Sequence, residues 1–367
     1  MKVLHIINNL GSGGAEKLIE EFLPLMNKVE GIEAEVLLLT NKNNVFDNGL
    51  RENFIEVEVI RRKKIGSPLN IFDIRRHIVK GKYDIVHAHL FPTNYWTSIA
   101  SKLIFNRRPK FVLTEHSTHN RRREKFYFKY IDRFIYSSFD KIISISQKTQ
   151  ENLISWVDPR QKNSVKFIVI ENGINLNRFF EAKPYCKSEI NRKFNVNSKL
   201  LCMVGRFSKQ KDQATVIKAM EGLPEDIHLL LIGEGTLKEK DEVLSREIGV
   251  QNRVHFLGFR NDVDRIFQTS DIVILSSNWE GFGLVAAEGM AAGKPVLASD
   301  VSGLREVVKG AGVLFPKGDS EELARIIKSL IKNQDEYRRI SDECLERAKL
   351  YNIDKMVKRY LDVYRDL

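Results

Sequence analysis

Two glutamates flank a glycine-containing connection in the segment Asn278-Trp279-Glu280-Gly281-Phe282-Gly283-Leu284-Val285-Ala286-Ala287-Glu288. Glu280 ends a predicted strand-to-helix connection, and Glu288 falls about two turns into the small-residue helix that follows. The glycines between them let a ligand approach the backbone. The helix N-terminus favours a phosphate, and a carboxylate on each side accepts hydrogen bonds from sugar hydroxyls. The segment therefore predicts a site for a sugar that carries phosphate.

A basic segment, Val204-Gly205-Arg206-Phe207-Ser208-Lys209-Gln210-Lys211-Asp212, follows another predicted strand and opens a helix. We expect Arg206 and Lys211 at the carboxyl end of a parallel sheet, where they can neutralise a diphosphate without a metal. Two solvated surface cations also explain this segment when it is taken alone.

A third loop, Asn9-Leu10-Gly11-Ser12-Gly13-Gly14-Ala15-Glu16, follows the first predicted strand. Its glycines permit close approach of a ligand, and the next helix N-terminus offers N–H groups to an anion. It is not a dinucleotide fingerprint, because Glu16 stands where the last glycine is required. A structural turn explains the loop equally well.

Both halves of the chain alternate short β-rich runs with longer amphipathic stretches, which predicts parallel sheets covered by helices. We expect strands at 2–8, 33–40, 54–60, 84–89, 110–114, 141–145, 166–170, 200–204, 227–232, 253–257, 271–275, 295–298 and 312–315. We expect helices at 14–28, 70–80, 94–105, 121–138, 146–156, 212–221, 236–248, 262–269, 284–292, 319–332, 335–349 and 353–366.

The fold class predicted from this alternation is α/β, with two Rossmann-like domains facing each other across a cleft. We place the domains at 1–175 and 176–349, so that the boundary between them falls in a polar linker at 172–198. We expect the helix at about 350–367 to pack back on the first domain. The length of 367 residues and the 43% hydrophobic content support two cores and exclude a disordered chain.

Apolar runs, the first residues and the cysteine spacing further restrict the class of protein. The chain has no apolar run as long as a membrane span, and its first residues read as a strand rather than a signal peptide, so we expect a cytoplasmic protein. The three cysteines, Cys186, Cys202 and Cys344, are scattered and predict neither disulfides nor a metal site.

In order along the chain, the segments GGAE, GRFSKQKD and EGFGLVAAE resemble glycosyltransferase family 4, which has the GT-B fold. The resemblance extends over nearly the whole chain through Asp84-Ile85-Val86-His87-Ala88-His89, Thr114-Glu115-His116, Glu171-Asn172-Gly173-Ile174 and Phe256-Leu257-Gly258-Phe259. It implies a retaining, metal-independent enzyme without a cofactor, whose donor substrate is a nucleotide-diphosphate sugar, with a UDP-sugar as our expectation.

The resemblance also implies roles for single residues. Glu280 would bind donor-sugar hydroxyls, Glu288 the ribose, and Arg206 with Lys211 the diphosphate. His116 would lie beside the reacting sugar. The rest of the implied donor site is Gly14, Phe259, Phe282, Gly283 and Leu284. Because no carboxylate is a candidate nucleophile on the opposite face, we expect same-face substitution, in which the leaving phosphate takes the proton of the acceptor.

Two patterns resemble metal sites. Asp262-Val263-Asp264 spells a DxD motif, but it stands at a predicted helix start, where aspartate caps well. His87 and His89 alternate on a predicted strand and so share one face. We favour packing, or the support of residues that contact substrate, for the histidines and capping for the aspartates, and we predict no metal.

Positive charge is concentrated in the first half: residues 1–180 hold 29 Lys and Arg against 19 Asp and Glu, while the remainder is close to neutral. The stretch from Arg121 to Tyr136 mixes cations with aromatics. Such a helix fits an anionic membrane or a lipid-linked pyrophosphate, so we assign Arg121, Arg122, Arg123 and Lys125 to acceptor or membrane binding. A solvated helix with core aromatics is the alternative, and no motif supports nucleic acid.

Together these patterns predict a retaining glycosyltransferase that moves a sugar to a hydroxyl of a glycan or lipid-linked acceptor, as in cell-surface polysaccharide synthesis. We expect it to be peripheral at the inner face of the membrane. A sugar-nucleotide epimerase of the same fold and a non-enzymic sugar-nucleotide-binding protein are the alternatives.

Overall fold

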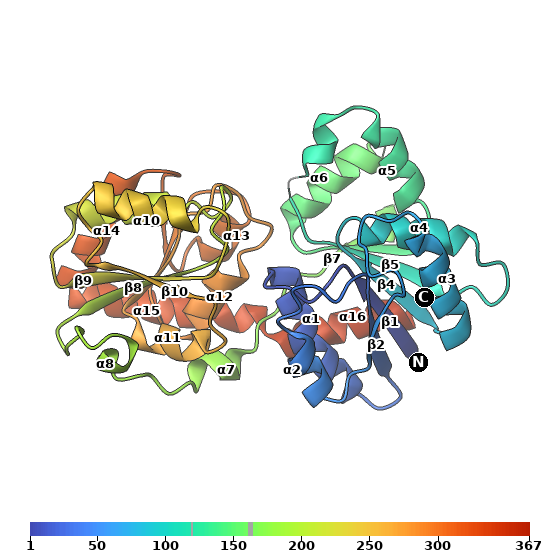
Figure 1. Cartoon of the computed structure of the whole chain (residues 1–367), viewed down its shortest axis with the longest axis horizontal. Coiled ribbons are helices and arrows are strands. Elements are labelled where there is room, and N and C mark those ends of the chain that lie inside the picture. The colour runs from blue at the N-terminus through green and yellow to red at the C-terminus, as the bar shows by residue number, and fades with distance from the viewer. Residues whose placement is uncertain (119, 161–163) are drawn as a thin grey trace. The chain divides into compact units, whose positions relative to one another are not determined.

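The computed structural model describes residues 1–118, 120–160 and 164–367, and it divides the chain into two compact units (Figure 1). Unit 1 comprises Met1–Gly173 together with Ile353–Leu367, and unit 2 comprises Ile174–Asn352. The chain thus passes from unit 1 to unit 2 two residues before the domain boundary predicted from the sequence, and it returns to unit 1 at Ile353.

In unit 1 the described residues form a seven-stranded parallel sheet with the order β3-β2-β1-β4-β5-β6-β7. Its strands are β1 (Lys2–Ile7), β2 (Glu33–Leu38), β3 (Val57–Val59), β4 (Ile85–His89), β5 (Lys110–Glu115), β6 (Lys141–Ser144) and β7 (Phe167–Val169). Its helices are α1 (Gly14–Asn27), α2 (Asp47–Glu52), α3 (Asn70–Gly81), α4 (Thr93–Lys102), α5 (Phe128–Tyr136), α6 (Gln147–Val157) and α16 (Ile353–Arg365), with 3-10 turns η1 (Arg121–Glu124) and η2 (Ser164–Lys166).

Unit 2 repeats the architecture with a six-stranded parallel sheet over its described residues, in the order β10-β9-β8-β11-β12-β13. Its strands are β8 (Lys199–Val204), β9 (Ile227–Ile232), β10 (Val254–Gly258), β11 (Ile272–Leu275), β12 (Val296–Ser299) and β13 (Val313–Phe315). Its helices are α7 (Leu176–Phe180), α8 (Lys187–Ile190), α9 (Gln213–Ala219), α10 (Lys238–Glu247), α11 (Val263–Thr269), α12 (Leu284–Ala291), α13 (Leu304–Val308), α14 (Ser320–Lys332) and α15 (Gln334–Ala348), with 3-10 turns η3 (Met220–Gly222) and η4 (Lys349–Tyr351).

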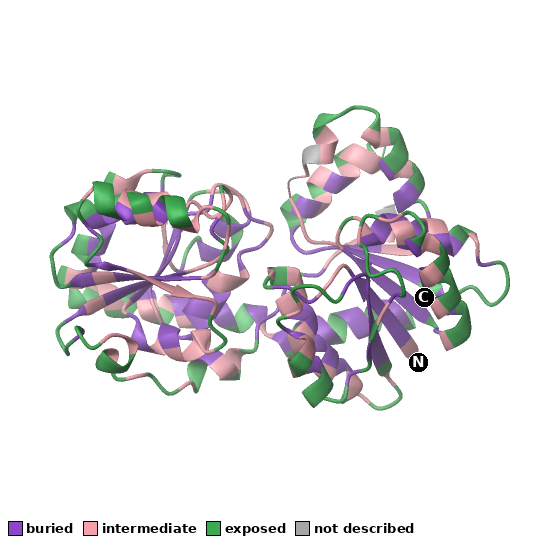
Figure 2. Cartoon of the chain, viewed as in Figure 1, coloured by how far each residue is buried: buried purple, intermediate pink, exposed green. Residues whose placement is uncertain are grey.

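Both strand orders reverse beside the first strand of the sheet, which is the doubly wound pattern. The fold class predicted from the sequence is therefore confirmed. In unit 2, α10 and α14 cover one face of the sheet, while α11 and α15 cover the other (Figure 1). The inner strands β8, β9, β11 and β12 are almost wholly buried between these layers, while the edge strands β10 and β13 are partly buried (Figure 2). Burial on both faces explains why the inner strands read as continuous apolar runs.

Helix α16 returns to unit 1 and packs against α1. Its apolar face buries Met356, Tyr360 and Tyr364. The ring of Tyr360 stacks on that of Phe22 in α1, with the ring centroids 5.7 Å apart. The C-terminal helix is thus part of the first core.

The predicted helix over 121–138 is wrong as a continuous element. The structure has the short turn η1, then Lys125–Tyr127, and only then α5. Asn120 caps the turn, accepting a hydrogen bond from the Arg122 N–H at 3.1 Å. Within the described residues, no helix combines the length and the apolar content needed to span a membrane.

Candidate functional site

The loops that follow β8 and β11 meet at the point where the strand order of unit 2 reverses. The Asn278 N–H donates to the Gln210 carbonyl at 2.7 Å. The Ser276 hydroxyl donates to the Asp212 carbonyl, also at 2.7 Å. The two segments that the sequence marked separately therefore form one surface at the carboxyl edge of the sheet.

Glu280 is the centre of this surface. Its carboxylate is buried and forms an ion pair with the Lys211 ammonium. The Ser277 hydroxyl donates to Oε1 at 2.8 Å, and the Gln210 amide reaches Oε2 at 3.4 Å. Three side chains thus fix the orientation of this carboxylate. The sequence pointed to Lys211 only as a diphosphate ligand and missed Ser277 and Gln210, which no motif marks.

Arg206 is exposed at the same edge, one residue beyond Gly205, and Glu288 is buried as the fifth residue of α12. Phe282 packs edge-on against Tyr351 with the ring centroids 5.1 Å apart. Phe259 follows β10 at this edge and is half-buried. The donor-site residues proposed in unit 2 therefore gather at the carboxyl edge of its sheet.

Two glycines allow close packing of the backbone around Glu280. Gly283 caps α12 at φ +90°, and a Cβ there would lie 2.5 Å from Leu304 Cδ2. Gly303 has φ +91°, and a Cβ there would lie 2.5 Å from the Glu280 carbonyl oxygen. Because side chains are excluded at both positions, the first N–H groups of α12 stand beside Glu280 without a side-chain cap.

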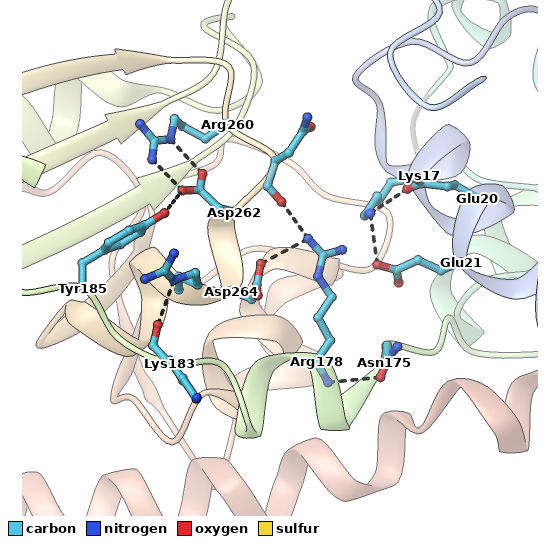
Figure 3. Close-up of polar contacts among 12 residues, drawn as sticks. Lys17, Glu20, Glu21, Asn175, Arg178, Lys183, Tyr185, Arg260, Asp262 and Asp264 are labelled. Atoms are coloured by element: carbon cyan, nitrogen blue, oxygen red, sulfur yellow. Dashed lines mark hydrogen bonds and ion pairs between the residues drawn. The ribbon is translucent and has the colours of Figure 1, made fainter. Parts of the chain in front are cut away.

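The DxD segment is engaged by arginines (Figure 3). Asp262 accepts two hydrogen bonds from Arg260, at 2.8 and 2.5 Å, and one from the Tyr185 hydroxyl at 2.5 Å. The Arg260 guanidinium holds the pKa of Asp262 at about 2. Asp264 pairs with Arg178 at 3.2 Å. Asp262 is the N-cap residue of α11 but does not cap with its side chain, so our capping prediction is wrong in detail.

In unit 1, Gly14 is exposed at the start of α1, where Gly13 is the N-cap. Lys17, one turn further, pairs with Glu20 at 2.6 Å and with Glu21 at 3.3 Å (Figure 3). The glycine loop thus opens a helix as predicted, and its first cation is engaged within that helix.

His116 follows β5 and is hydrogen-bonded to a buried histidine, His89, with His89 Nδ1 and His116 Nε2 3.1 Å apart. His89 Nε2 is in turn 3.0 Å from His5 Nδ1. His87 bonds instead to the Tyr364 hydroxyl at 2.5 Å and to the Thr114 hydroxyl at 2.7 Å. The sequence placed His87 and His89 on one face but did not connect them to His116, since that contact depends on sheet register.

The basic segment is arranged differently from our prediction. Arg122 stacks over Phe91, 3.9 Å from the ring centroid, and Arg123 pairs with Glu115 at 3.3 Å. Both arginines therefore bind within unit 1. Lys125 is exposed, and the side chain of Arg121 lies outside the described part of the structure.

Two family models match this chain. Residues 12–178 match Glycosyltransferase Family 4, and residues 187–346 match Glycosyl transferases group 1. The chain therefore belongs to the family 4 glycosyltransferases, and the resemblance seen in the sequence is confirmed.

Named relatives and solved structures agree with this assignment. The UDP-Gal:alpha-D-GlcNAc-diphosphoundecaprenol alpha-1,3-galactosyltransferase of Escherichia coli is 26% identical, over 100% of this chain and 97% of its own length. The putative glycosyltransferase EpsD of Bacillus subtilis is 26% identical over 77% of this chain and 76% of its own. The structure of Anabaena Alr3699/HepE in complex with UDP and glucose superposes with a TM-score of 0.85 at 25% identity, covering 100% of both chains. The protein is thus a glycosyltransferase of the GT-B fold.

Proposed function

We propose that this enzyme is a retaining glycosyltransferase that transfers a sugar from a UDP-sugar to a hydroxyl of a lipid-linked or glycan acceptor. The observation that carries the proposal is the buried Glu280 carboxylate, fixed by Lys211 and Ser277 beside the start of α12. The names of two relatives support the substrate classes. The Escherichia coli enzyme is named for UDP-Gal and a diphosphoundecaprenol acceptor, and the Anabaena protein was solved with UDP and glucose.

The chemistry follows from where charge develops. As the glycosidic bond breaks, negative charge grows on the departing diphosphate. The exposed Arg206 and the uncapped N–H groups of α12 can stabilise that charge, with each good donor worth about 3 kcal/mol in the transition state. Glu288 would hold the ribose, and Gly14 would lie against the phosphates or the acceptor. This set of groups needs no metal or cofactor.

Retention is proposed to occur by substitution on one face of the sugar. A carboxylate engaged by an ammonium and a hydroxyl is a hydrogen-bond acceptor for sugar hydroxyls rather than a free nucleophile, which describes Glu280. The leaving phosphate would then take the proton of the attacking hydroxyl.

The decisive experiment measures turnover with UDP-, GDP- and ADP-sugars, first ranked by thermal shift. We expect a UDP-sugar to bind best and to be turned over with retention, as read by NMR of the product anomer. Arg206→Ala should lower kcat/KM by roughly 10²-fold, whereas Lys209→Ala, an exposed cation on the same loop, should not. Activity that EDTA abolishes and Mn²⁺ restores would refute the metal-free mechanism.

We further propose that α5 and the residues before it rest on an anionic membrane. Phe126, Tyr130 and Phe134 are 79%, 68% and 56% exposed, which contradicts the core alternative for these three rings, although Tyr136 in the same stretch is buried. The Lys102 ammonium lies 3.8 Å from the centroid of the Phe134 ring, and Lys125 is exposed beside them. Exposed rings among lysines combine insertion at the headgroup level with attraction to anionic lipid.

Flotation with vesicles tests this surface. The triple variant Lys125→Gln, Phe126→Ser, Tyr130→Ser should lose most of its binding to phosphatidylglycerol vesicles, while Phe54→Ser, which changes an exposed ring elsewhere in unit 1, should not. Binding should also fall with added salt, because screening weakens the attraction. Equal binding to phosphatidylcholine vesicles, or an unaffected triple variant, would contradict the membrane role.

A further inference from the structure

Three histidines of unit 1 form a hydrogen-bonded chain that ends at His116, just after β5. His5 in β1 contacts His89 at the end of β4, and His89 contacts His116 after β5, with nitrogen separations of 3.0 and 3.1 Å. Both bonds join ring nitrogens. Each bond therefore needs one nitrogen that carries hydrogen and one that does not.

Burial keeps the three hydrogen-bonded histidines uncharged. His5 and His89 have no solvent exposure. Desolvation lowers the pKa of His5 to about 3 and that of His116 to about 4, and it holds the pKa of His89 well below its usual range. At neutral pH each ring is therefore neutral and carries a single N–H, on one nitrogen or the other.

His5, at the buried end of this row of hydrogen-bonded histidines, decides which ring nitrogen carries the hydrogen. His5 Nε2 is buried and has no hydrogen-bond partner. The Phe22 ring lies edge-on with the ring centroids 5.3 Å apart and offers no lone pair, and the His87 ring, at 5.1 Å, has both nitrogens bonded to hydroxyls. A buried N–H without an acceptor is the costlier of the two arrangements. The hydrogen of His5 therefore belongs on Nδ1, which donates to His89 Nε2.

The remaining assignments follow in sequence. His89 accepts at Nε2, so as a neutral ring it carries its hydrogen on Nδ1 and donates to His116 Nε2. His116 then accepts at Nε2 and carries its own hydrogen on Nδ1. An orphaned atom on β1 thus determines the protonation of a ring two steps away.

We propose that His5 and His89 are positioning residues that fix His116 as a neutral Nδ1–H tautomer, so that it meets the substrate as a hydrogen-bond donor and not as a base. The substrate part of this inference rests on the proposed function and on the family resemblance, which implies that His116 lies beside the reacting sugar. A donor at that position suits a sugar or phosphate oxygen. His116 cannot act as a base at Nδ1, because that nitrogen already carries hydrogen and the lone pair of Nε2 accepts from His89.

A second set of contacts keeps the middle of the chain in place. His87 stacks on His89 with the ring centroids 4.3 Å apart, and both of its nitrogens are bonded, to Tyr364 and Thr114. One nitrogen from each of His5, His87 and His89 lies within 4.8 Å of the others, the separation that a metal would need. Because both nitrogens of His87 and both nitrogens of His89 are already hydrogen-bonded, these bonds account for the two rings without a metal.

The test uses the full chain labelled with ¹⁵N-histidine and needs no substrate. Long-range ¹H–¹⁵N spectra at pH 7.5 should show His5, His89 and His116 all as Nδ1–H tautomers, the form that a neutral histidine side chain free in solution populates less. Each signal is assigned from a variant that lacks that histidine. An Nε2–H tautomer or an imidazolium at His116 would overturn the proposal, as would stoichiometric zinc bound to the purified protein and lost with His87→Gln.

Two isosteric pairs extend the test to mechanism. His89→Asn offers an N–H to His116 and should retain its Nδ1–H tautomer, whereas His89→Asp offers only acceptors and should move the hydrogen to Nε2. His116→Asn should keep more transfer activity than His116→Asp, with about a 10²-fold difference in kcat/KM. His228→Gln in unit 2 is the control and should change neither readout. If the parent tautomers are as expected but the two His116 variants are equally active, the positioning stands and the proposed substrate role fails.

Discussion

Mild acid should unfold unit 1, because its buried histidines must stay neutral. His5, His87 and His89 have no solvent exposure, and burial is the main cause that lowers the pKa of each. The unfolded chain takes up protons at these side chains near a pKa of about 6.5, whereas the folded unit does not. The free energy of unfolding therefore falls as the pH falls below about 6.5.

The size of the effect follows from the same linkage. Between pH 7 and pH 5, a histidine that titrates only in the unfolded state costs about 2 kcal/mol. Three such side chains cost about 6 kcal/mol, which is comparable with the whole stability of a typical domain, about 5–15 kcal/mol. The loss continues until the pH reaches the folded pKa, about 3 for His5.

Urea denaturation at a series of pH values measures this loss. Trp279→Phe leaves Trp96 and Trp156, both in unit 1, as the fluorescence reporters. In that background, His5→Met should reduce the pH dependence by the equivalent of one proton, and His228→Gln in unit 2 should leave it unchanged. A urea midpoint for unit 1 that stays constant from pH 7 to pH 5 would refute the reasoning.

Three further outcomes are expected. Glu288→Ala should weaken binding of UDP alone, while Glu280→Ala should leave it nearly unchanged and relax discrimination among donor sugars; equal losses in calorimetry would contradict these roles. Gly303→Ala should destabilise the protein more than Gly249→Ala in thermal unfolding, because both have positive φ, +91° and +75°, but only the first would place a Cβ 2.5 Å from a carbonyl oxygen. Tyr364→Phe should cost about 1–3 kcal/mol in urea unfolding, since it removes the bond to a buried imidazole nitrogen.

The sheets could be predicted from the sequence because parallel strands buried on both faces read as unbroken apolar runs. Short helices such as α2 and α13, with six and five residues, carry too little periodicity to be recognised. The stretch 121–138 failed for another reason. Its spacing of rings and cations is the same whether the rings face the core or solvent, and only tertiary packing decides that Phe126 and Tyr130 are exposed.

The residues of the candidate donor site could be predicted from the sequence, but the contacts between them could not. Both Lys211 and Glu280 were expected at the carboxyl edge of the sheet, yet their pairing depends on the adjacency of β8 and β11, which are 68 residues apart in sequence from Val204 to Ile272. Arg122 and Arg123 illustrate the same limit. A run of cations predicts attraction to an anion, but a ring 3.9 Å away and a carboxylate 3.3 Å away engage them instead.

The two sheets share the doubly wound strand order, but the side chains at the point where that order reverses are charged in unit 2 and neutral in unit 1. In unit 2 the reversal holds the ion pair of Lys211 and Glu280, with Arg206 exposed nearby, as a site for a charged diphosphate requires. In unit 1 the equivalent strands, β1 and β4, present His5 and His87 side by side, both neutral because desolvation lowers their pKa. Under the proposed function, a neutral donor such as His116 would bind a sugar oxygen without competing with Arg206 for the phosphates.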